Sequence, residues 1–284
     1  MAVQAPSTEQ IRDAWDALAP RFDQFTTAEW VMPLGERVLR RVELRPGTRF
    51  LDVACGAGAL AIPAARRGAD VVAVDIAPTM IDRLRGRASA EGLTTIEGRV
   101  MDGEALELPD DTFDVSASQN GVSLFPNLER GLSEIVRATR PGGQVLIVAF
   151  GAPRKAEFLT VFLGALKACV PGFTPLPTDP PPLPFQLADR GRFRQVLESA
   201  GLTDVRVDAL SWETNFASAN RFWDVVTASN PIAVQLTRDL TGEQRTAVQQ
   251  VLDGMFRERS GGAPNAVLST EMNIGTGTKD QRSP

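Results

Sequence analysis

Four nearly continuous apolar runs, separated by helical patterns, constrain the fold of this chain more than any other feature. They read RFLDVA, VVAVDI, FDVSAS and QVLIVAF and lie within residues 49–150. Strands that are apolar on both faces are typical of parallel sheets covered by helices on both sides. Repeated strand–helix units of this length predict an α/β fold with a doubly wound, mostly parallel sheet.

The residues between these runs indicate where the connecting helices begin and end. One helix is expected over residues 59–67, and the next opens at Pro78 and ends near Gly92. Residues 94–101 predict a further, weaker strand. A third helix is expected to begin at Asn127, whose side chain can cap it.

The chain outside this alternation divides into additions to the sheet. Residues 1–48 open with STEQIRDAWDALA, a capped amphipathic pattern that predicts a helix, either packed on the body or closing over a ligand as a lid. Residues 49–151 form the predicted ligand-binding α/β core. Residues 152–278 are predicted to finish the sheet with two strands and to insert helices over a substrate site. Residues 279–284 are an expected frayed tail.

Within the C-terminal part, two features indicate a roof over a substrate pocket. Phe158 begins an amphipathic helix, and Phe222 and Trp223 form an aromatic pair farther along. Residues 171–184, half of which are proline, predict an extended surface segment. Ordinary packing is the alternative role for each of these aromatic side chains.

Composition excludes several classes of protein. At 284 residues and 43% hydrophobic content, the chain can bury a full core. No leader pattern opens it and no apolar stretch reaches the roughly 18–20 residues that span a bilayer, so a cytoplasmic protein without a membrane span is expected. The net charge of −5 argues against nucleic acid as a partner. Two cysteines, Cys55 and Cys169, are too few for a disulfide framework or a structural metal site.

The stretch FLDVACGAGALA joins a strand to a glycine turn. Gly56, Gly58 and Ala61 satisfy G-x-G-x-x-G/A, and Asp75 lies about 20 residues downstream at the end of the next strand. This pattern fits a nicotinamide dinucleotide, but an acid at the second position suits any ribose diol, because a carboxylate accepts from both hydroxyls.

Two further carboxylates favour a different ligand. Asp52 would repel a pyrophosphate bound above the glycines, whereas a ligand with an ammonium and a sulfonium group would gain from it. Asp102 ends the third strand and can accept from an adenine amine, while Gly103 lets the backbone approach the ring. Three acids at three successive strand ends therefore indicate S-adenosylmethionine.

The stretch FLDVACGAGALAIPAARRGADVVAVDIAPTMI resembles the nucleotide-binding half of class I S-adenosylmethionine-dependent methyltransferases, in particular the small-molecule (UbiE-like) branch. LPDDTFDVSASQNGVSLFPNLERGLSEIVRATRPGGQVLI is similar to the continuation of that pattern. The resemblance implies a Rossmann-like sheet of seven strands with the last one antiparallel, and S-adenosylmethionine as cofactor. It covers about residues 8–151 and is not diagnostic over residues 152–265.

The resemblance also implies roles for individual residues. The methionine moiety is expected at the glycine turn with Asp52, the ribose at Asp75, and the adenine at Asp102 with Gly103. The full set of implied cofactor-binding residues is Asp52, Gly56, Gly58, Asp75, Ile76, Met80, Asp102, Gly103, Ser118, Gln119 and Phe22. Asn120 and Phe25 are implied on the substrate side, with core packing as the alternative for Phe22 and Phe25. No metal ligand is implied.

Methyl transfer to a small-molecule acceptor, without metal and mainly by positioning, is therefore the expected function of a monomer or homodimer. A NAD(P)-dependent oxidoreductase and a non-catalytic S-adenosylmethionine-binding protein are the alternatives. The chain contains no histidine and no tyrosine, so any general base must be Asp, Glu or Lys, and dehydrogenases that use those two residues are disfavoured. This absence also raises the hypothesis of an engineered variant in which Phe22, Asn120 or Phe125 replaces Tyr or His.

Overall fold

The computed structural model describes residues 7–174, 181–229 and 231–281. Its seven strands form one sheet in the order β3-β2-β1-β4-β5-β7-β6, in which β7 runs antiparallel to both of its neighbours. The strands are β1 (Arg49–Val53), β2 (Asp70–Asp75), β3 (Ile96–Val100), β4 (Phe113–Gln119), β5 (Thr139–Phe150), β6 (Leu202–Phe216) and β7 (Ala266–Lys279). The predicted fold, with its strand number and its single antiparallel strand, is confirmed.

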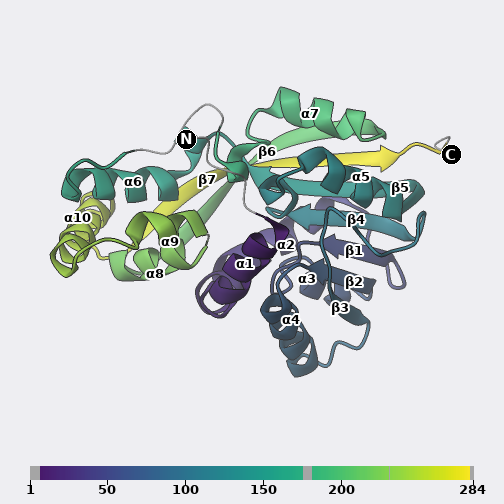
Figure 1. Cartoon of the computed structure of the whole chain (residues 1–284), viewed down its shortest axis with the longest axis horizontal. Coiled ribbons are helices and arrows are strands. Elements are labelled where there is room, and N and C mark those ends of the chain that lie inside the picture. Colours follow the sequence, from purple (N-terminus) through teal and green to yellow (C-terminus); the bar gives the residue numbers. More distant parts are fainter. Residues whose placement is uncertain (1–6, 175–180, 230, 282–284) are drawn as a thin grey trace.

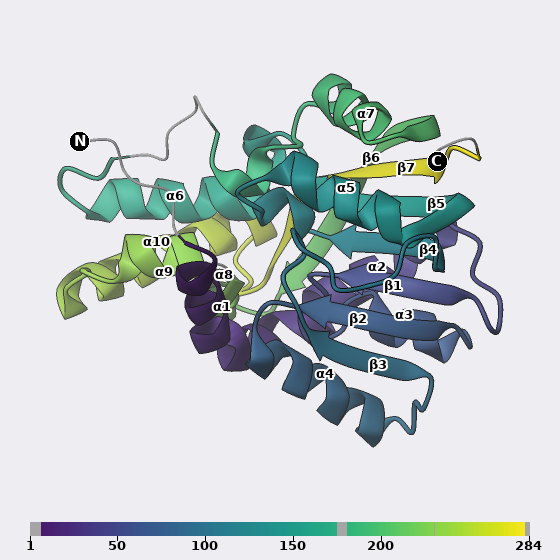
Figure 2. The same ribbon diagram turned by 45° about the vertical axis from the view of Figure 1, so that its right-hand side comes forward.

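Helices cover both faces of this sheet, as Figure 1 and Figure 2 show. One face packs against α2 (Met32–Val38), α3 (Ala61–Arg66) and α4 (Pro78–Ala90). The other packs against α5 (Leu128–Ala138) and α7 (Arg190–Ser199). Successive residues of β1, Phe50 and Leu51, enter opposite cores, which explains why these strands carry no polar alternation. The expected first helix begins two residues late, at Ala61.

The last two strands extend beyond the sheet and carry a group of helices. Figure 1 shows β6 and β7 running from the sheet into α6 (Glu157–Cys169), α8 (Ala219–Ser229), α9 (Pro231–Thr237) and α10 (Gly242–Ser260). A third apolar core joins these helices to the far ends of β6 and β7. Phe222 and Trp223 lie in this core and not along the cavity, so they have the packing role that the sequence left open as the alternative to a pocket roof: Phe222 packs on Phe216 and Phe256, and Trp223 on Phe162.

The N-terminal segment contacts both the sheet domain and this helical group. Helix α1 (Thr8–Phe22) has the predicted capping box between Ser7 and Gln10 and continues into η1 (Asp23–Val31), a π-helix. Arg87 of α4 donates to Asp23 at 2.5 Å, and Arg221 of α8 pairs with Glu29 at 2.6 Å. The segment is therefore fixed to both parts of the molecule. No pattern in the sequence predicts the π-helix.

Two C-terminal expectations differ from the structure. Pro184 and Phe185, at the end of the proline-rich stretch, form part of a buried 3₁₀ turn, η5 (Leu183–Phe185), while residues 175–180 lie outside the described residues. Lys279 is not frayed: it ends β7, is 7% exposed, and donates to Asp111 at 2.7 Å. A buried ammonium held by a carboxylate fixes this end of the sheet.

Candidate functional site

A large cavity lies at the carboxyl ends of β1 to β5, where open α/β sheets bind their ligands. The N-terminal segment and α6 close its other sides, and its empty space, counted to the open mouth, is about 1300 Å³. The strand order divides it into two halves. Residues after β2 and β3 line one half, and residues at the ends of β4 and β5 line the other, about 14 Å away at the usual strand spacing.

The glycine turn between β1 and α3 forms the floor of the first half. Ala54, Gly56 and Gly58 all have positive φ angles, of 55°, 53° and 99°. A Cβ on Gly58 would lie 2.6 Å from Leu84 and 2.7 Å from Ile62, so this glycine allows α3 to pack closely against α4. Ala54 adopts the left-handed conformation without being glycine, which costs about 1–2 kcal/mol.

Asp52 lies beneath this turn rather than on the cavity wall. It is 1% exposed, and its Oδ2 accepts from the backbone N–H of Ala61 at 2.9 Å, at the start of α3. Burial, reinforced by the charge of Asp75 and opposed by backbone hydrogen bonds from Ala61 and Leu60, raises the pKa of Asp52 to about 8. With this pKa the Asp52 carboxyl is largely protonated at neutral pH, so it supports the turn from below and gives the cavity no full negative charge.

Asp75 faces the cavity and fixes the turn at the same time. Its Oδ2 accepts from Gly56 N–H at 2.9 Å and its Oδ1 from Ala77 N–H at 3.0 Å. Burial raises the pKa of this carboxyl, and the backbone donors oppose that shift. Ile76 and Met80 line the cavity beside it.

Asp102 and Gly103 form the edge of the cavity beyond β3. Asp102 Oδ1 accepts from Glu104 N–H at 2.9 Å. A Cβ on Gly103 would lie 2.4 Å from the Phe125 ring and 3.0 Å from Val53, so only glycine fits against this aromatic side chain.

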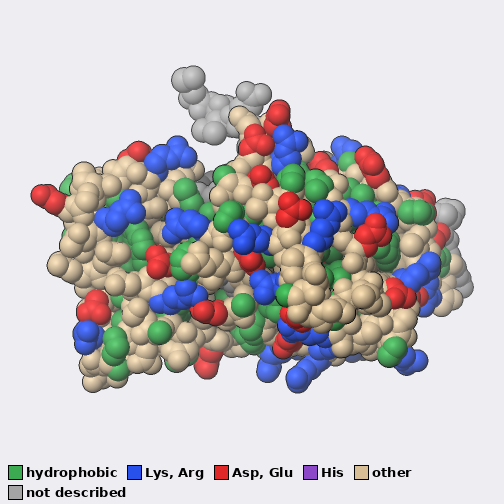
Figure 3. All heavy atoms as spheres, turned by 90° about the horizontal axis from the view of Figure 1, so that it is seen from below, with side chains coloured by type: hydrophobic (Ala, Val, Ile, Leu, Met, Phe, Trp, Pro, Cys, Tyr) green, Lys and Arg blue, Asp and Glu red, His purple; other side chains and the backbone are tan. Residues whose placement is uncertain are grey.

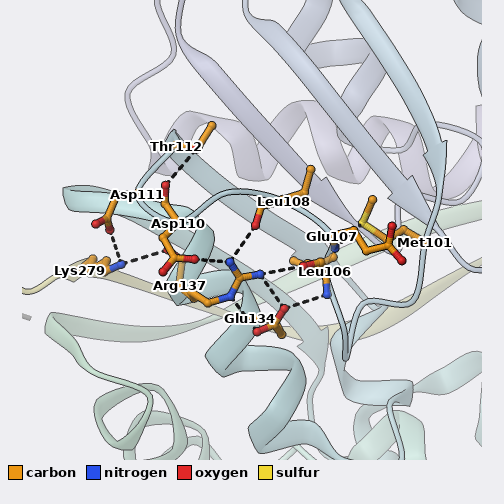
Figure 4. A network of polar contacts seen from close by, with 10 residues as sticks. All are labelled: Met101, Leu106, Glu107, Leu108, Asp110, Asp111, Thr112, Glu134, Arg137 and Lys279. Atoms are coloured by element: carbon orange, nitrogen blue, oxygen red, sulfur yellow. Dashed lines mark hydrogen bonds and ion pairs between the residues drawn. The ribbon is translucent and has the colours of Figure 1, made fainter. Parts of the chain in front are cut away.

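The loop that follows is held by Arg137 of α5, as Figure 4 shows. The guanidinium donates to the carbonyls of Leu106 and Leu108 at 2.9 and 2.8 Å. It also pairs with Glu134, at 2.8 Å, and with Asp110. Glu134 in turn accepts from Leu106 N–H at 2.8 Å. This network fixes the segment after Asp102.

The second half of the cavity is aromatic. Trp30 of η1, Phe150 at the end of β5 and Phe158 of α6 line it, with ring centroids 5.6–6.2 Å apart. Phe185 of η5 packs behind Phe150 at 5.7 Å. Four separate elements thus contribute to one apolar wall.

Several polar atoms in this aromatic half have no hydrogen-bond partner. Among the described residues, six buried side-chain polar atoms are unpartnered, and four of them belong to side chains that line the cavity. These four are Thr27 Oγ1, Trp30 Nε1, Gln119 Oε1 and Asn120 Oδ1. Gln119 is oriented by its Nε2, which donates to Val31 O at 2.7 Å. Asn120 has a φ of 58°, a strained value of the kind that concentrates at functional sites.

The charge of the lining is entirely negative. Asp75, Asp102 and Glu104 line the cavity, and none of its described lining residues is lysine or arginine. A phosphate-bearing ligand would find no counter-charge here, whereas a cationic adenosyl compound meets both carboxylates and aromatic walls. The carboxylates and aromatic side chains along the cavity therefore fit S-adenosylmethionine.

The structure brings most of the residues implied by the resemblance together. Lining the cavity are Phe22, Gly56, Asp75, Ile76, Met80, Asp102, Gly103, Gln119 and Asn120. Asp52, Gly58, Ser118 and Phe25 are not among its lining residues. Ser118 is buried and its Oγ accepts from Val122 N–H at 3.1 Å, while Arg221 lies over the Phe25 ring at 5.0 Å.

Sequence reasoning missed Thr27, Trp30 and Phe150 as lining residues. Phe150 carries a usable signal, because it ends a strand at the ligand-binding edge of the sheet. Thr27 and Trp30 carry no such signal, because their positions along the cavity depend on the π-helix η1, which no sequence pattern predicts.

Comparison with known proteins identifies a family. The family described as "Methyltransferase domain" matches residues 51–147. Demethylmenaquinone methyltransferase of Streptomyces avermitilis is 33% identical over 168 residues, covering 57% of this chain and 69% of the relative. Nocamycin O-methyltransferase of Saccharothrix syringae is 37% identical over 134 residues, covering 46% and 48%. The chain spans about half the length of most curated relatives it matches.

A solved structure extends the likeness of fold over nearly the whole chain. Phosphoethanolamine N-methyltransferase 2 of Haemonchus contortus, in complex with phosphomonomethylethanolamine and S-adenosylhomocysteine, has a TM-score of 0.61 and 17% identity. The match covers 98% of this chain and 61% of that one. Within the described part of this chain, no helix combines the length and apolarity needed to cross a bilayer, and no cluster of His, Cys, Asp and Glu is arranged to hold a metal.

Proposed function

Because the chain belongs to the S-adenosylmethionine-dependent methyltransferase family, we propose that it transfers a methyl group from S-adenosylmethionine to a small-molecule acceptor. The observation that carries this proposal is the charge of the cavity, which has three lining carboxylates and, among its described residues, no cation. A sulfonium and an ammonium group are stabilised there, and a phosphate is not.

The residues that would hold the cofactor lie over β1 to β3. Asp75 would accept from the ribose hydroxyls, with Ile76 and Met80 against the adenosine, and Asp102 and Gly103 would receive the adenine. Gly56, Gln119 and Phe22 would contact the methionine end. We assign Asp52, Gly58 and Ser118 to supporting positions, because each is buried in the scaffold around the turn.

When bound, S-adenosylmethionine supplies an electrophilic methyl group, so transfer needs neither a protein nucleophile nor a metal. The chain's own contribution is to align the acceptor and exclude water. The aromatic wall of Trp30, Phe150 and Phe158 is suited to both tasks, since it is apolar and rigidly packed. The N-terminal segment would act as a lid, because Phe22 and Trp30 line the cavity from above.

A small acceptor is favoured over nucleic acid by the charge of the surface. Figure 3 shows Lys and Arg interspersed with Asp and Glu over one face of the molecule, and the net charge is −5. A phosphate backbone binds instead to surfaces on which basic residues cluster.

Calorimetric titration with S-adenosylmethionine and, separately, NAD tests the proposal. We expect S-adenosylmethionine alone to bind, and Asp75→Asn to weaken it at least tenfold. Asp82→Asn, which neutralises an exposed carboxylate on α4, is the matched control and should bind like the parent. Binding of NAD alone would favour an oxidoreductase. Binding of S-adenosylmethionine without methyl transfer to any acceptor in a broad panel would leave a non-catalytic binding protein.

A further inference from the structure

The N-terminal segment, residues 8–31, lines both halves of the cavity. Its first part, α1, contributes Trp15 and Phe22, and its second part, η1, contributes Trp30 to the aromatic half. Resting on the proposed function, we infer that Asp16 is a positioning residue that couples the two halves. By capping α4 from another helix, it holds the segment against the cofactor half, so that cofactor binding and the placement of the aromatic wall depend on each other.

Helix α4 begins without a side-chain cap of its own. Its N-cap residue, Ala77, has no side-chain acceptor, and Pro78 has no N–H, so Thr79 carries the first N–H that needs a partner. The carboxylate of Asp16 fills this place from α1, because its Oδ1 accepts from Thr79 N–H at 2.7 Å. A negative charge at a helix N-terminus is also stabilised by the helix dipole. Asp16 therefore caps α4 although it belongs to a different helix.

The stretch that Asp16 caps carries the residues proposed to bind the adenosine. Ile76 and Met80 belong to it and line the cavity. Within the same stretch, Asp75 accepts from Ala77 N–H at 3.0 Å. Asp16 itself is not among the residues that line the cavity. Its effect on a ligand is therefore indirect, through the position of the first turn of α4.

The apolar contact beside this hydrogen bond consists largely of small side chains. Its members are Ala19, Ala57, Ala77 and Met80, with Trp15 and Phe22 packed against them. Because alanine buries little apolar area, polar anchors contribute much of the attachment. The second anchor is Asp23 of η1, which pairs with Arg87 at 2.5 Å. Two acids of the segment thus hold it to the first and last turns of α4, an arrangement that we call docked.

The position of α1 also sets the position of Trp30, because the helical backbone continues from α1 into η1 without a break. Trp30 packs against Phe150 and Phe158, with ring centroids 6.2 and 5.6 Å apart. A cofactor that contacts Phe22 favours the docked segment, since this contact exists only when α1 is in place. The docked segment completes the aromatic wall, and by linkage a compound bound at that wall favours the cofactor to the same degree.

Calorimetric titration with S-adenosylhomocysteine tests the inference on three variants. Asp16→Ala removes the acceptor, so the docked fraction should fall and the Kd should rise about threefold to tenfold. Asp16→Asn keeps an oxygen that accepts from Thr79 N–H, so its Kd should lie within about twofold of that of the parent. Asp13→Ala removes an exposed carboxylate from the same helix and is the matched control, expected to bind like the parent.

Hydrogen exchange measured by mass spectrometry reports the coupling itself. In the parent, S-adenosylhomocysteine should slow exchange across residues 8–31, including residues 27–31, which reach the aromatic half. In Asp16→Ala saturated with the same ligand, exchange over residues 27–31 should be several-fold faster than in the saturated parent, because it scales with the remaining undocked fraction. Asp16→Asn should restore the slow exchange.

Two results would overturn the inference while leaving the proposed function in place. One is an affinity of Asp16→Ala for S-adenosylhomocysteine equal to that of the parent, or exchange over residues 27–31 that does not respond to this ligand in the parent. The other is an Asp16→Asn variant that binds as weakly as Asp16→Ala, since the hydrogen bond to Thr79 would then not be the cause. If neither S-adenosylmethionine nor S-adenosylhomocysteine binds to the parent, the proposed function and the inference both fail.

Discussion

Replacing Thr27 by valine should stabilise the ligand-free protein. Thr27 is fully buried and its hydroxyl has no partner, which costs about 1–3 kcal/mol in an otherwise apolar site. Valine keeps the branched shape and exchanges the hydroxyl for a methyl group. We expect the free energy of unfolding of the ligand-free protein to rise by about 1–2 kcal/mol, which raises Tm by a few degrees in a chain of this length.

Thr139→Val is the matched control, because it makes the same chemical change at another fully buried site. Thr139 Oγ1 lies 2.7 Å from both Ser116 Oγ and the Ile135 carbonyl, so valine should lower the free energy of unfolding by about 1–2 kcal/mol. Urea unfolding without ligand measures both changes. Equal losses of stability in the two variants would refute the argument, because Thr27 would then have an internal partner.

Three further changes test other parts of the structure. Asp52→Asn should remove a pH dependence of the free energy of unfolding. The pKa of Asp52 is about 8 in the folded chain against an ordinary 3.8, so the folded chain keeps this proton at pH values where the unfolded chain loses it. The free energy of unfolding of the parent therefore falls as pH rises between these two values, by up to about 1.4 kcal/mol per pH unit. Urea unfolding at low and high pH should show parent and variant diverging. Ala54→Gly should raise the free energy of unfolding by about 0.5 kcal/mol, because relief of the left-handed backbone strain outweighs the added conformational entropy of the unfolded chain. A decrease would show that Ala54 is not strained in this conformation. Arg137→Lys should lower the free energy of unfolding by about 1–2 kcal/mol, because one ammonium cannot hold two carbonyls and two carboxylates. It should also weaken S-adenosylmethionine binding in calorimetry; an unchanged affinity would show that the loop after Asp102 does not affect the cofactor site.

The sheet could be predicted from the sequence because its signals are local. Apolar runs, the cap at Asn127 and the glycine turn each act within a few residues, and the structure confirms them. The positions of Asp75 and Asp102 along the cavity follow from the same logic, since topology brings the ends of parallel strands to one edge.

The aromatic half of the cavity could not be predicted in this way, because its walls come from segments far apart in the chain. Trp30 reaches the cavity only because α1 continues as a π-helix, and Phe158 only because β6 and β7 extend far enough to support α6. Asp52 illustrates the reverse case. Its position in the sequence indicates a ligand contact, but its Oδ2 accepts instead from the backbone N–H of Ala61 at the start of α3.

The division of the cavity between two sets of segments has an evolutionary consequence. The family match ends at residue 147, before Phe150 and Phe158, and begins after Thr27 and Trp30. Mutations that reshape the aromatic wall can therefore accumulate without disturbing β1 to β3, over which the residues proposed to hold the nucleoside lie. Relatives can inherit one methyl-donor module intact while each lineage changes the compound it modifies.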